Sequence, residues 1–143
     1  MKHGRKGRKL NRTSSHRKAL MSNLVSSLVI HKQIKTTDVK AKELRGYAER
    51  LVTYAKKNNL HGRRLILKSI KGNNKKNIAN ILIHEIAPMY IERNGGYTRI
   101  IKLANRKNDN SLVSIIEFVD FKKVHKDDKD HSEEAKVVSE DEK

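Results

Sequence analysis

Residues 34–55 decide the fold class, and they read IKTTDVKAKELRGYAERLVTYA. The stretch opens with Ile34-Lys35-Thr36-Thr37, where β-branched residues fill three of four positions, as is typical of a short strand. Thr37 can cap a helix, and Asp38 suits the positive end of its dipole. The apolar residues that follow are spaced as on one helical face; they are Ala41, Leu44, Ala48, Leu51, Val52 and Ala55. A strand followed directly by an amphipathic helix predicts a mixed fold.

A second amphipathic helix is predicted on the N-terminal side of this stretch. Ser14 and Ser15 are candidate N-caps, because a serine hydroxyl can accept from the free amides of a first helical turn. Leucines recur every four residues after them, which predicts about four turns; they are Leu20, Leu24 and Leu28. We expect this helix to end near His31.

Two further helices and a hairpin are predicted on the C-terminal side. Leu65, Ile66 and Ile70 indicate a short helix. A fourth helix carries the apolar residues Ile78, Ile81, Leu82, Ile86 and Met89. Pro88 should kink or end it, because proline lacks a backbone donor. After a turn at Gly95-Gly96, residues 99–103 and 112–119 read as two strands joined by a polar loop, which favours a β-hairpin.

These elements predict an α+β domain over residues 14–120, with about four helices packed on a small two- to three-stranded sheet. Residues 1–13 are almost wholly basic and polar, so we expect an extended N-terminal arm that is disordered when alone. Residues 121–143 hold eight acids and six lysines with little to pack, so we expect an acidic, mixed-charge and disordered tail.

The charge distribution points to a polyanionic partner. The net charge is +17, and the first acidic residue is Asp38. Ten cations precede it without one carboxylate, namely Lys2, Arg5, Lys6, Arg8, Lys9, Arg12, Arg17, Lys18, Lys32 and Lys35. Nucleic acid is the commonest polyanion in a cell and supplies the missing negative charge. Aromatic residues make up only 4%, which argues against a stacking platform for single strands and favours recognition of phosphates and shape.

The arm and the helix start after it form the first candidate site. Its expected nucleic-acid contacts are Lys2, His3, Arg5, Lys6, Arg8, Lys9, Asn11, Arg12, Ser15, His16, Arg17 and Lys18, with Lys35 in the strand beyond. Arginine can fork onto a phosphate, lysine acts as a point charge, and a helix N-terminus attracts anions. The alternatives are a solvated basic tail, a localisation signal, and ordinary capping by serine.

The second candidate site is the turn Arg93-Asn94-Gly95-Gly96-Tyr97-Thr98-Arg99. Arg93, Gly95, Gly96 and Arg99 would meet nucleic acid, and Tyr97 could stack on a base or sugar. The alternative, a helix-to-strand connector with Tyr97 in the core, is equally compatible with the composition.

The sequence contains no motif that indicates catalysis or insertion into a membrane. No cysteine is present, and the seven histidines have no metal-ligand spacing. His84-Glu85 lacks the second histidine of a metalloprotease helix. We therefore expect no enzyme, no metal or other cofactor, and no small-molecule substrate. The first residues lack the apolar stretch of a secretory signal, and no apolar run approaches a membrane span. We expect a soluble cytoplasmic protein.

Four stretches resemble the bacterial large-subunit ribosomal protein seventeen family in order and spacing. They are MKHGRKGRKLNR (1–12) with SSHR (14–17), IKTT (34–37) before AKELR (41–45), NGGYTRI (94–100), and IEFVD (116–120). The resemblance covers about residues 1–120 and implies an α+β domain with a basic N-terminal extension. It implies binding to large-subunit ribosomal RNA around the peptide exit, ribosomal proteins as neighbours, and no catalysis. The resemblance also favours RNA contact as the role of the turn at Gly95 and Gly96.

We therefore expect a structural constituent of the large ribosomal subunit that binds ribosomal RNA by charge and shape and supports assembly and translation. The alternative is an architectural DNA-binding protein, which shares the charge. Such proteins usually need a dimer or an intercalating apolar wedge, and neither is evident here.

Overall fold

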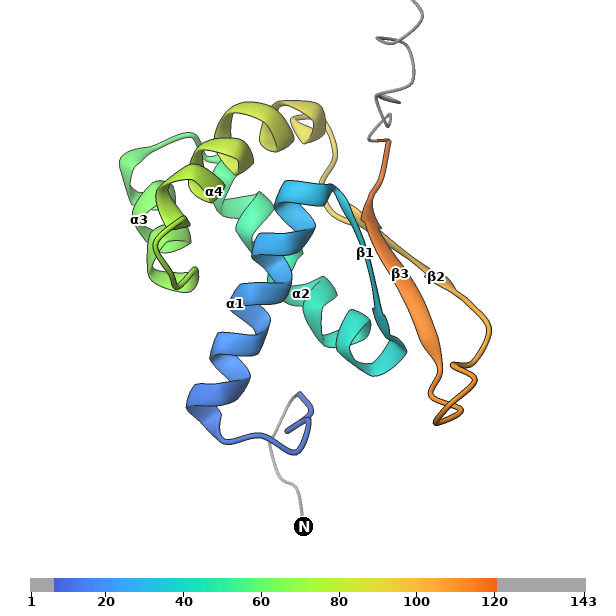
Figure 1. Ribbon diagram of the computed structural model, residues 1–143. Coiled ribbons are helices and arrows are strands. Elements are labelled where there is room, and N and C mark those ends of the chain that lie inside the picture. The colour runs from blue at the N-terminus through green and yellow to red at the C-terminus, as the bar shows by residue number, and fades with distance from the viewer. Residues whose placement is uncertain (1–6, 121–143) are drawn as a thin grey trace, which may run out of the picture.

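The computed structural model describes residues 7–120 of the chain. Their elements, in chain order, are α1 (Ser14–His31), β1 (Gln33–Thr37), α2 (Asp38–Lys56), α3 (Leu60–Ser69), α4 (Lys75–Ile81), a π-helical turn (Leu82–Ile86), a 3-10 turn (Ala87–Tyr90), β2 (Thr98–Lys102) and β3 (Val113–Phe118). Helices lie on one side of a small sheet (Figure 1), so the predicted α+β class is confirmed. The tail and residues 1–6 of the arm lie outside the described residues.

The three strands form one antiparallel sheet in the order β1-β3-β2. The predicted hairpin of β2 and β3 is present, and β1 pairs with the other edge of β3. The register places Ile34 and Ile100 on either side of Ile116. Because side chains alternate along a strand, this row and its neighbour Phe118 face α2, while Lys35 and Ile115 face outwards. One face of the sheet therefore closes the core, and the other faces solvent.

Helix α2 is the centre of the core, as its sequence pattern predicts. All six of its predicted apolar positions are at most 1% exposed. Helices α1 and α3, α4 with its continuing turns, and the sheet pack around it. Gly62 lets α3 approach α2 closely, because a Cβ there would lie 2.4 Å from the Tyr54 carbonyl oxygen. The Tyr47 hydroxyl also donates to the Ser69 carbonyl at 2.6 Å, which ties the end of α3 to α2.

Helix α1 differs in detail from its predicted pattern. Thr13, rather than Ser14 or Ser15, occupies the N-cap position, and its side chain makes no capping bond. Leu20 and Leu24 are only half-buried. The buried face includes Ser22, whose hydroxyl accepts from the Lys71 amide at 2.7 Å. The contact with a distant loop, which local spacing does not reveal, sets the orientation of this helix.

The fourth helix ends in a wider π-helical turn and then a tighter 3-10 turn that contains Pro88, which agrees with the expectation that Pro88 kinks or ends the helix. The α-helical part stops at Ile81, and a π-helical turn and a 3-10 turn continue the path to Tyr90. Met89, which was predicted to be part of the apolar face, is 47% exposed, whereas Tyr90 is 1% exposed. The prediction for Met89 was wrong because the change of helical geometry rotates the buried face by one position.

Candidate nucleic-acid interface

The described part of the arm is folded back on α1. Residues 9–12 form a turn in which the Arg12 amide donates to the Lys9 carbonyl at 3.1 Å, rather than the predicted extended chain. The Arg17 guanidinium donates to the backbone carbonyls of Arg12 at 3.2 Å and Lys9 at 3.4 Å. Leu10 and Asn11 have positive φ angles, which give the turn its shape. The arm thus leaves the start of α1 in a defined direction.

Within residues 7–120, the cations of this region have no carboxylate partner. Arg8, Lys9 and Lys18 are exposed, and Arg12 and Arg17 are half-buried. None of these five residues forms an ion pair within residues 7–120. Arg17 donates to backbone carbonyls, and Arg12 Nη1 lies 2.7 Å from His16 Nε2. The predicted contacts Lys2, His3, Arg5 and Lys6 lie outside the described residues.

The N-terminus of α1 adds free backbone donors to these cations. Ser15 and His16 are exposed in its first turn, and that turn contains no acidic residue. Without a side-chain cap, the first amides of the helix point towards solvent. Free amides and a helix dipole attract anions, and phosphate groups fit such a position. Residues 7–18 can therefore bind several phosphates at once.

The second candidate site, the turn at residues 93–99, has a different electrostatic character. Arg93 Nη1 lies 3.0 Å from Asp120 Oδ2, and Arg99 Nε lies 3.0 Å from Glu117 Oε1. Both arginines are thus neutralised by carboxylates at the end of β3. Gly95 and Gly96 are exposed, and Gly96 has a φ of +63°, which a residue with a side chain adopts at a cost. The turn has the backbone shape expected from its sequence but no net positive charge.

Tyr97 belongs to the core, so the base-stacking role predicted for it does not fit the structure. It is 3% exposed, and its ring centroid lies 5.2 Å from that of Tyr90. Lys56 Nζ lies 5.3 Å from the ring centroid and 3.3 Å from the hydroxyl oxygen of Tyr97. Burial, aided by the nearby Asp120 charge, raises the pKa of Tyr90 to about 12. The burial agrees with the open alternative, a helix-to-strand connector with a core tyrosine. The RNA contacts expected of Arg93, Gly95, Gly96 and Arg99 stay a prediction.

The sheet and the β2–β3 loop carry cations that the sequence reasoning missed. Lys35, which was predicted, is exposed on the outer face of β1. Lys102, Arg106 and Lys107 follow at the end of β2 and in the loop, and all three are exposed. The run Asn105-Arg106-Lys107-Asn108 could have revealed them, but its turn chemistry alone was interpreted. These residues extend the basic surface beyond the arm.

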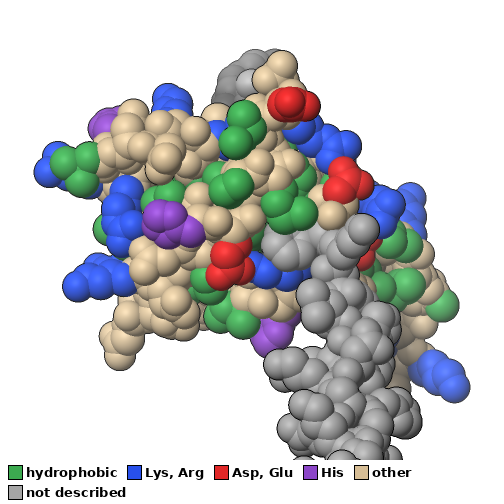
Figure 2. Space-filling view, turned by 90° about the horizontal axis from the view of Figure 1, so that it is seen from above, with side chains coloured by type: hydrophobic (Ala, Val, Ile, Leu, Met, Phe, Trp, Pro, Cys, Tyr) green, Lys and Arg blue, Asp and Glu red, His purple; other side chains and the backbone are tan. Residues whose placement is uncertain are grey.

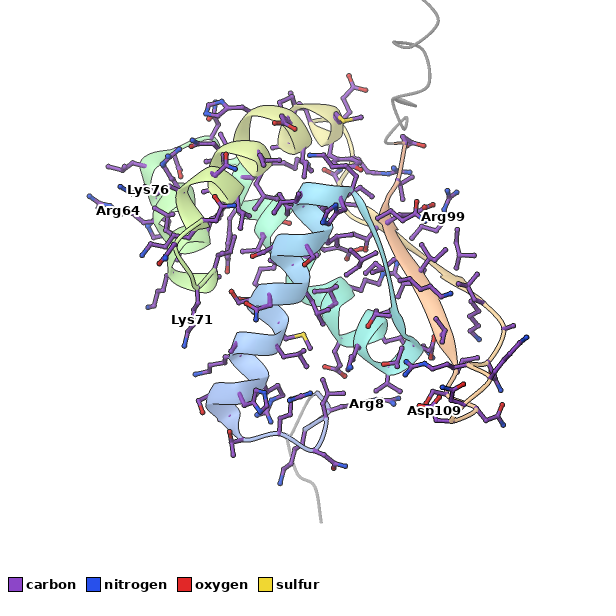
Figure 3. The ribbon with its side chains drawn as sticks, viewed as in Figure 1. Arg8, Arg64, Lys71, Lys76, Arg99 and Asp109 are labelled. Carbon is purple, nitrogen blue, oxygen red and sulfur yellow. The ribbon has the colours of Figure 1, made fainter. Side chains whose placement is uncertain are left out.

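The loop and the arm both approach the N-terminal half of α2. The Asp38 amide donates to the Leu112 carbonyl at 3.0 Å, which anchors the loop there. On the arm side, a Cβ at Gly7 would lie 3.4 Å from Glu43 Oε2 in the first turns of α2. Figure 3 shows Arg8 and Asp109 at this end of the molecule and Arg99 towards the other. Two basic segments far apart in the sequence are thus brought to one end.

The acids Asp38 and Asp109 near the loop already have hydrogen-bonding partners of their own. Hydrogen bonding to Lys42 is the main cause that holds the pKa of Asp38 below its usual range, and Ser114 adds to it. The hydroxyl and amide of Ser111 lower the pKa of Asp109 in the same way. The opposite end of the molecule differs, because hydrophobic and acidic side chains occupy the centre of that face and cations lie mainly at its edges (Figure 2).

Residues 7–120 offer neither a membrane span nor a metal site. No helix in this range is both long and apolar enough to cross a membrane. No three histidine, cysteine or acidic side chains of these residues gather in a way that could hold a metal ion.

Comparison with known proteins identifies the family. The family model described as "Ribosomal protein L17" matches residues 20–119. The chain is also similar to a protein of Agrobacterium fabrum named "Large ribosomal subunit protein bL17", with 48% identity over 120 residues, which cover 84% of this chain and 83% of that protein. The family match includes most of α1, all of α2, the sheet and the turn at residues 93–99. The chain belongs to the ribosomal protein L17 family.

Proposed function

We propose that this chain is a structural constituent of the large ribosomal subunit and binds large-subunit ribosomal RNA through residues 1–18. Family membership supports the first part of the proposal. The observation that carries the second part is the set of five cations in residues 7–18, none of which has a carboxylate partner in the described chain. The proposed role places the chain in the ribosome in the cytoplasm and involves no catalysis and no cofactor.

The proposed mechanism is electrostatic clamping. The folded domain docks on RNA helices, while the arm enters crevices between RNA segments and orders there. Ordering costs conformational entropy, which is offset when phosphates are neutralised and their counterions are released. Arginine and lysine contacts to phosphates carry no sequence information, so recognition is of shape and backbone. The remaining partners are ribosomal proteins near the peptide exit, and binding supports subunit assembly and translation.

Deleting residues 1–12 tests this mechanism. The deletion removes six lysines and arginines and no residue of the hydrophobic core. Affinity for large-subunit ribosomal RNA should fall, and the slope of log affinity against log salt should drop by about 0.9 for each phosphate that the protein no longer neutralises. Filter binding between low and physiological salt measures both quantities, and thermal unfolding by circular dichroism checks that the domain still folds.

A folded deletion variant with full affinity and an unchanged salt slope would contradict the clamp. Sedimentation tests the broader assignment: the full chain should migrate with the large subunit on a sucrose gradient and stay there after a high-salt wash. Migration with nucleoid DNA, or stronger competition by duplex DNA than by ribosomal RNA, would favour an architectural DNA-binding protein instead.

A further inference from the structure

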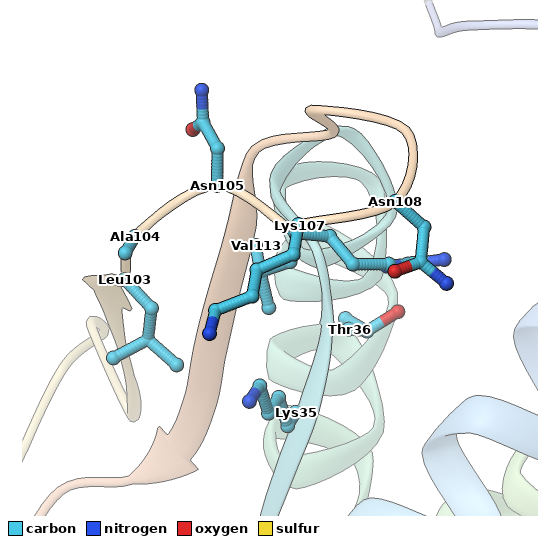
Figure 4. Close-up of a pocket in the computed structure, with 9 residues that line it drawn as sticks. Lys35, Thr36, Leu103, Ala104, Asn105, Lys107, Asn108 and Val113 are labelled. Carbon is cyan, nitrogen blue, oxygen red and sulfur yellow. The ribbon is translucent and has the colours of Figure 1, made fainter.

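A hollow of about 780 Å³ opens between strand β1 and the loop that joins β2 to β3. Figure 4 shows side chains of β1 and of the loop around it, among them Lys35, Lys107 and Asn108. Leu103 and Val113 provide an apolar part of its wall. The hollow is separate from residues 7–18, to which the proposed function assigns RNA binding.

The loop that forms one wall is held in a single shape by its own hydrogen bonds. The Arg106 amide donates to the Ser111 carbonyl at 2.9 Å, and the Asn110 amide donates back to the Arg106 carbonyl at 2.9 Å. The Asn105 amide group also donates to Asn110 Oδ1 at 2.9 Å. At the base, the Leu103 amide donates to the Val113 carbonyl at 2.8 Å. A preorganised loop loses little entropy when it binds a partner.

The charges around the hollow are unbalanced in favour of cations. Lys35 and Lys107 are exposed, and neither forms an ion pair within residues 7–120. The carboxylate nearest in the loop, that of Asp109, lies 3.6 Å from Arg106 and accepts from the Ser111 hydroxyl at 2.8 Å. It therefore has its own partners and does not neutralise the lysines. Two such lysines on opposite walls suit an anion with more than one charged group.

The apolar wall and the position of the hollow narrow the choice of anion. Leu112, which adjoins the lining residue Val113 in the sequence, is 41% exposed, and Ile101, two residues before Leu103, is 40% exposed. An RNA backbone presents both charged phosphates and the less polar faces of riboses, so it complements cations beside apolar carbons. The hollow also lies next to the N-terminal end of α2, and Gly7 of the arm lies near Glu43 in the same part of that helix. One continuous RNA-facing end of the molecule would include both.

We propose that this hollow is a second binding site for the phosphate backbone of ribosomal RNA, with Lys35 and Lys107 each contacting a phosphate and Asn108 donating to a backbone oxygen. The inference rests on the proposed function of the chain as an RNA-binding ribosomal protein. Because lysine contacts a phosphate as a point charge, the site reads the spacing of the backbone rather than base identity.

The first test compares two charge-matched double variants of the full chain. Lys35→Gln with Lys107→Gln should lower affinity for large-subunit ribosomal RNA and reduce the salt slope by about two, one for each phosphate contact. The control is Lys75→Gln with Lys76→Gln, two exposed lysines at the start of α4 that have no ion pair in the described chain and do not line the hollow. An equal loss in both variants, or no loss at K35Q/K107Q, would overturn the second site.

The second test uses the absence of cysteine from the chain. Asn108→Cys and, as a reporter near the arm, Ser14→Cys each carry a tethered iron–EDTA group in reconstituted large subunits, where hydroxyl radicals cut nearby RNA. The site predicts cuts from both positions, in different RNA segments. Cuts from position 14 alone would overturn the second site and leave the proposed function intact. Failure of the wild-type chain to enter the subunit would overturn the proposed function itself.

Discussion

Residues 7–18 and the turn at residues 93–99 lie at opposite ends of the molecule (Figure 1), and their cations differ in the partners they have. Residues 7–18 contain five cations and no acid, and the carboxylate that adjoins them, that of Glu43 near Gly7, pairs with none of the five within residues 7–120. In the turn, Arg93 and Arg99 each face a carboxylate, and Tyr97 is buried beneath them. Both regions are rich in arginine and glycine, yet only the first presents net positive charge to a partner. The two regions therefore differ in whether their arginines have a carboxylate partner, rather than in composition.

The difference has a simple topological cause. The carboxylates that neutralise the turn come from Glu117 and Asp120, 18 and 27 residues away from their arginines. The antiparallel register brings them there, since Arg99 lies directly opposite Glu117. The first 37 residues contain no acid to offer. The turn is therefore a structural joint between the helices and the sheet, and the N-terminal region is the proposed RNA-binding surface.

The largest expected effect on stability comes from Tyr97→Ala, which tests the structural role of the turn at residues 93–99. Removing a buried aromatic ring that packs on Tyr90 should lower the free energy of unfolding by about 3 kcal/mol or more. Tyr97→Phe is the matched control, because it keeps the ring and removes only the hydrogen bond between the hydroxyl and Lys56. Urea unfolding measures both. A stable Y97A variant that binds RNA weakly would instead assign the ring to base stacking.

A smaller effect is expected from Gly96→Ala. The φ of +63° disfavours any residue with a Cβ, so the substitution should cost about 1 kcal/mol of unfolding free energy, although no atom blocks the new methyl group. Gly46→Ala is the control: it lies in the middle of α2 with open space around it, and alanine should stabilise the helix by about 0.5–1 kcal/mol. Opposite signs in thermal unfolding are the expected result, and a stabilised G96A variant would contradict the structural role of the turn.

Much of the fold follows from local pattern. The strand at residues 34–37, the buried face of α2 and the hairpin were all predicted, because each depends on spacing that a short window contains. The cap of α1 and the burial of Tyr90 in place of Met89 were not, since they depend on distant contacts and on a change of helical geometry. The core position of Tyr97 was one of two open alternatives, and only the packing of Tyr90 against it decides between them.

The candidate site, like the fold, was predictable from the sequence only where local pattern is sufficient. A run of cations without a carboxylate is visible in sequence, so the arm was identified directly, and its RNA contacts remain a prediction. The neutralisation of Arg93 and Arg99 could not be seen, because their partners lie in a distant part of the sequence that the fold brings near. The loop cations Arg106 and Lys107 were visible in the sequence but were missed because only the turn chemistry of their run was interpreted. Their position beside Lys35 could not be seen, since the sheet creates it.

The most direct test of the central claim has the smallest expected effect on stability. The claim is that the unpaired cations of the N-terminal region bind RNA and that the paired arginines do not. Salt-dependent binding to large-subunit ribosomal RNA should be compared for Arg8→Gln with Lys9→Gln and for Arg93→Gln with Arg99→Gln. The two variants remove the same charge. We predict that the slope falls by about two for R8Q/K9Q and hardly changes for R93Q/R99Q, whose broken ion pairs cost only about 0.2–1 kcal/mol of stability each. An equal or larger fall for R93Q/R99Q would contradict the claim.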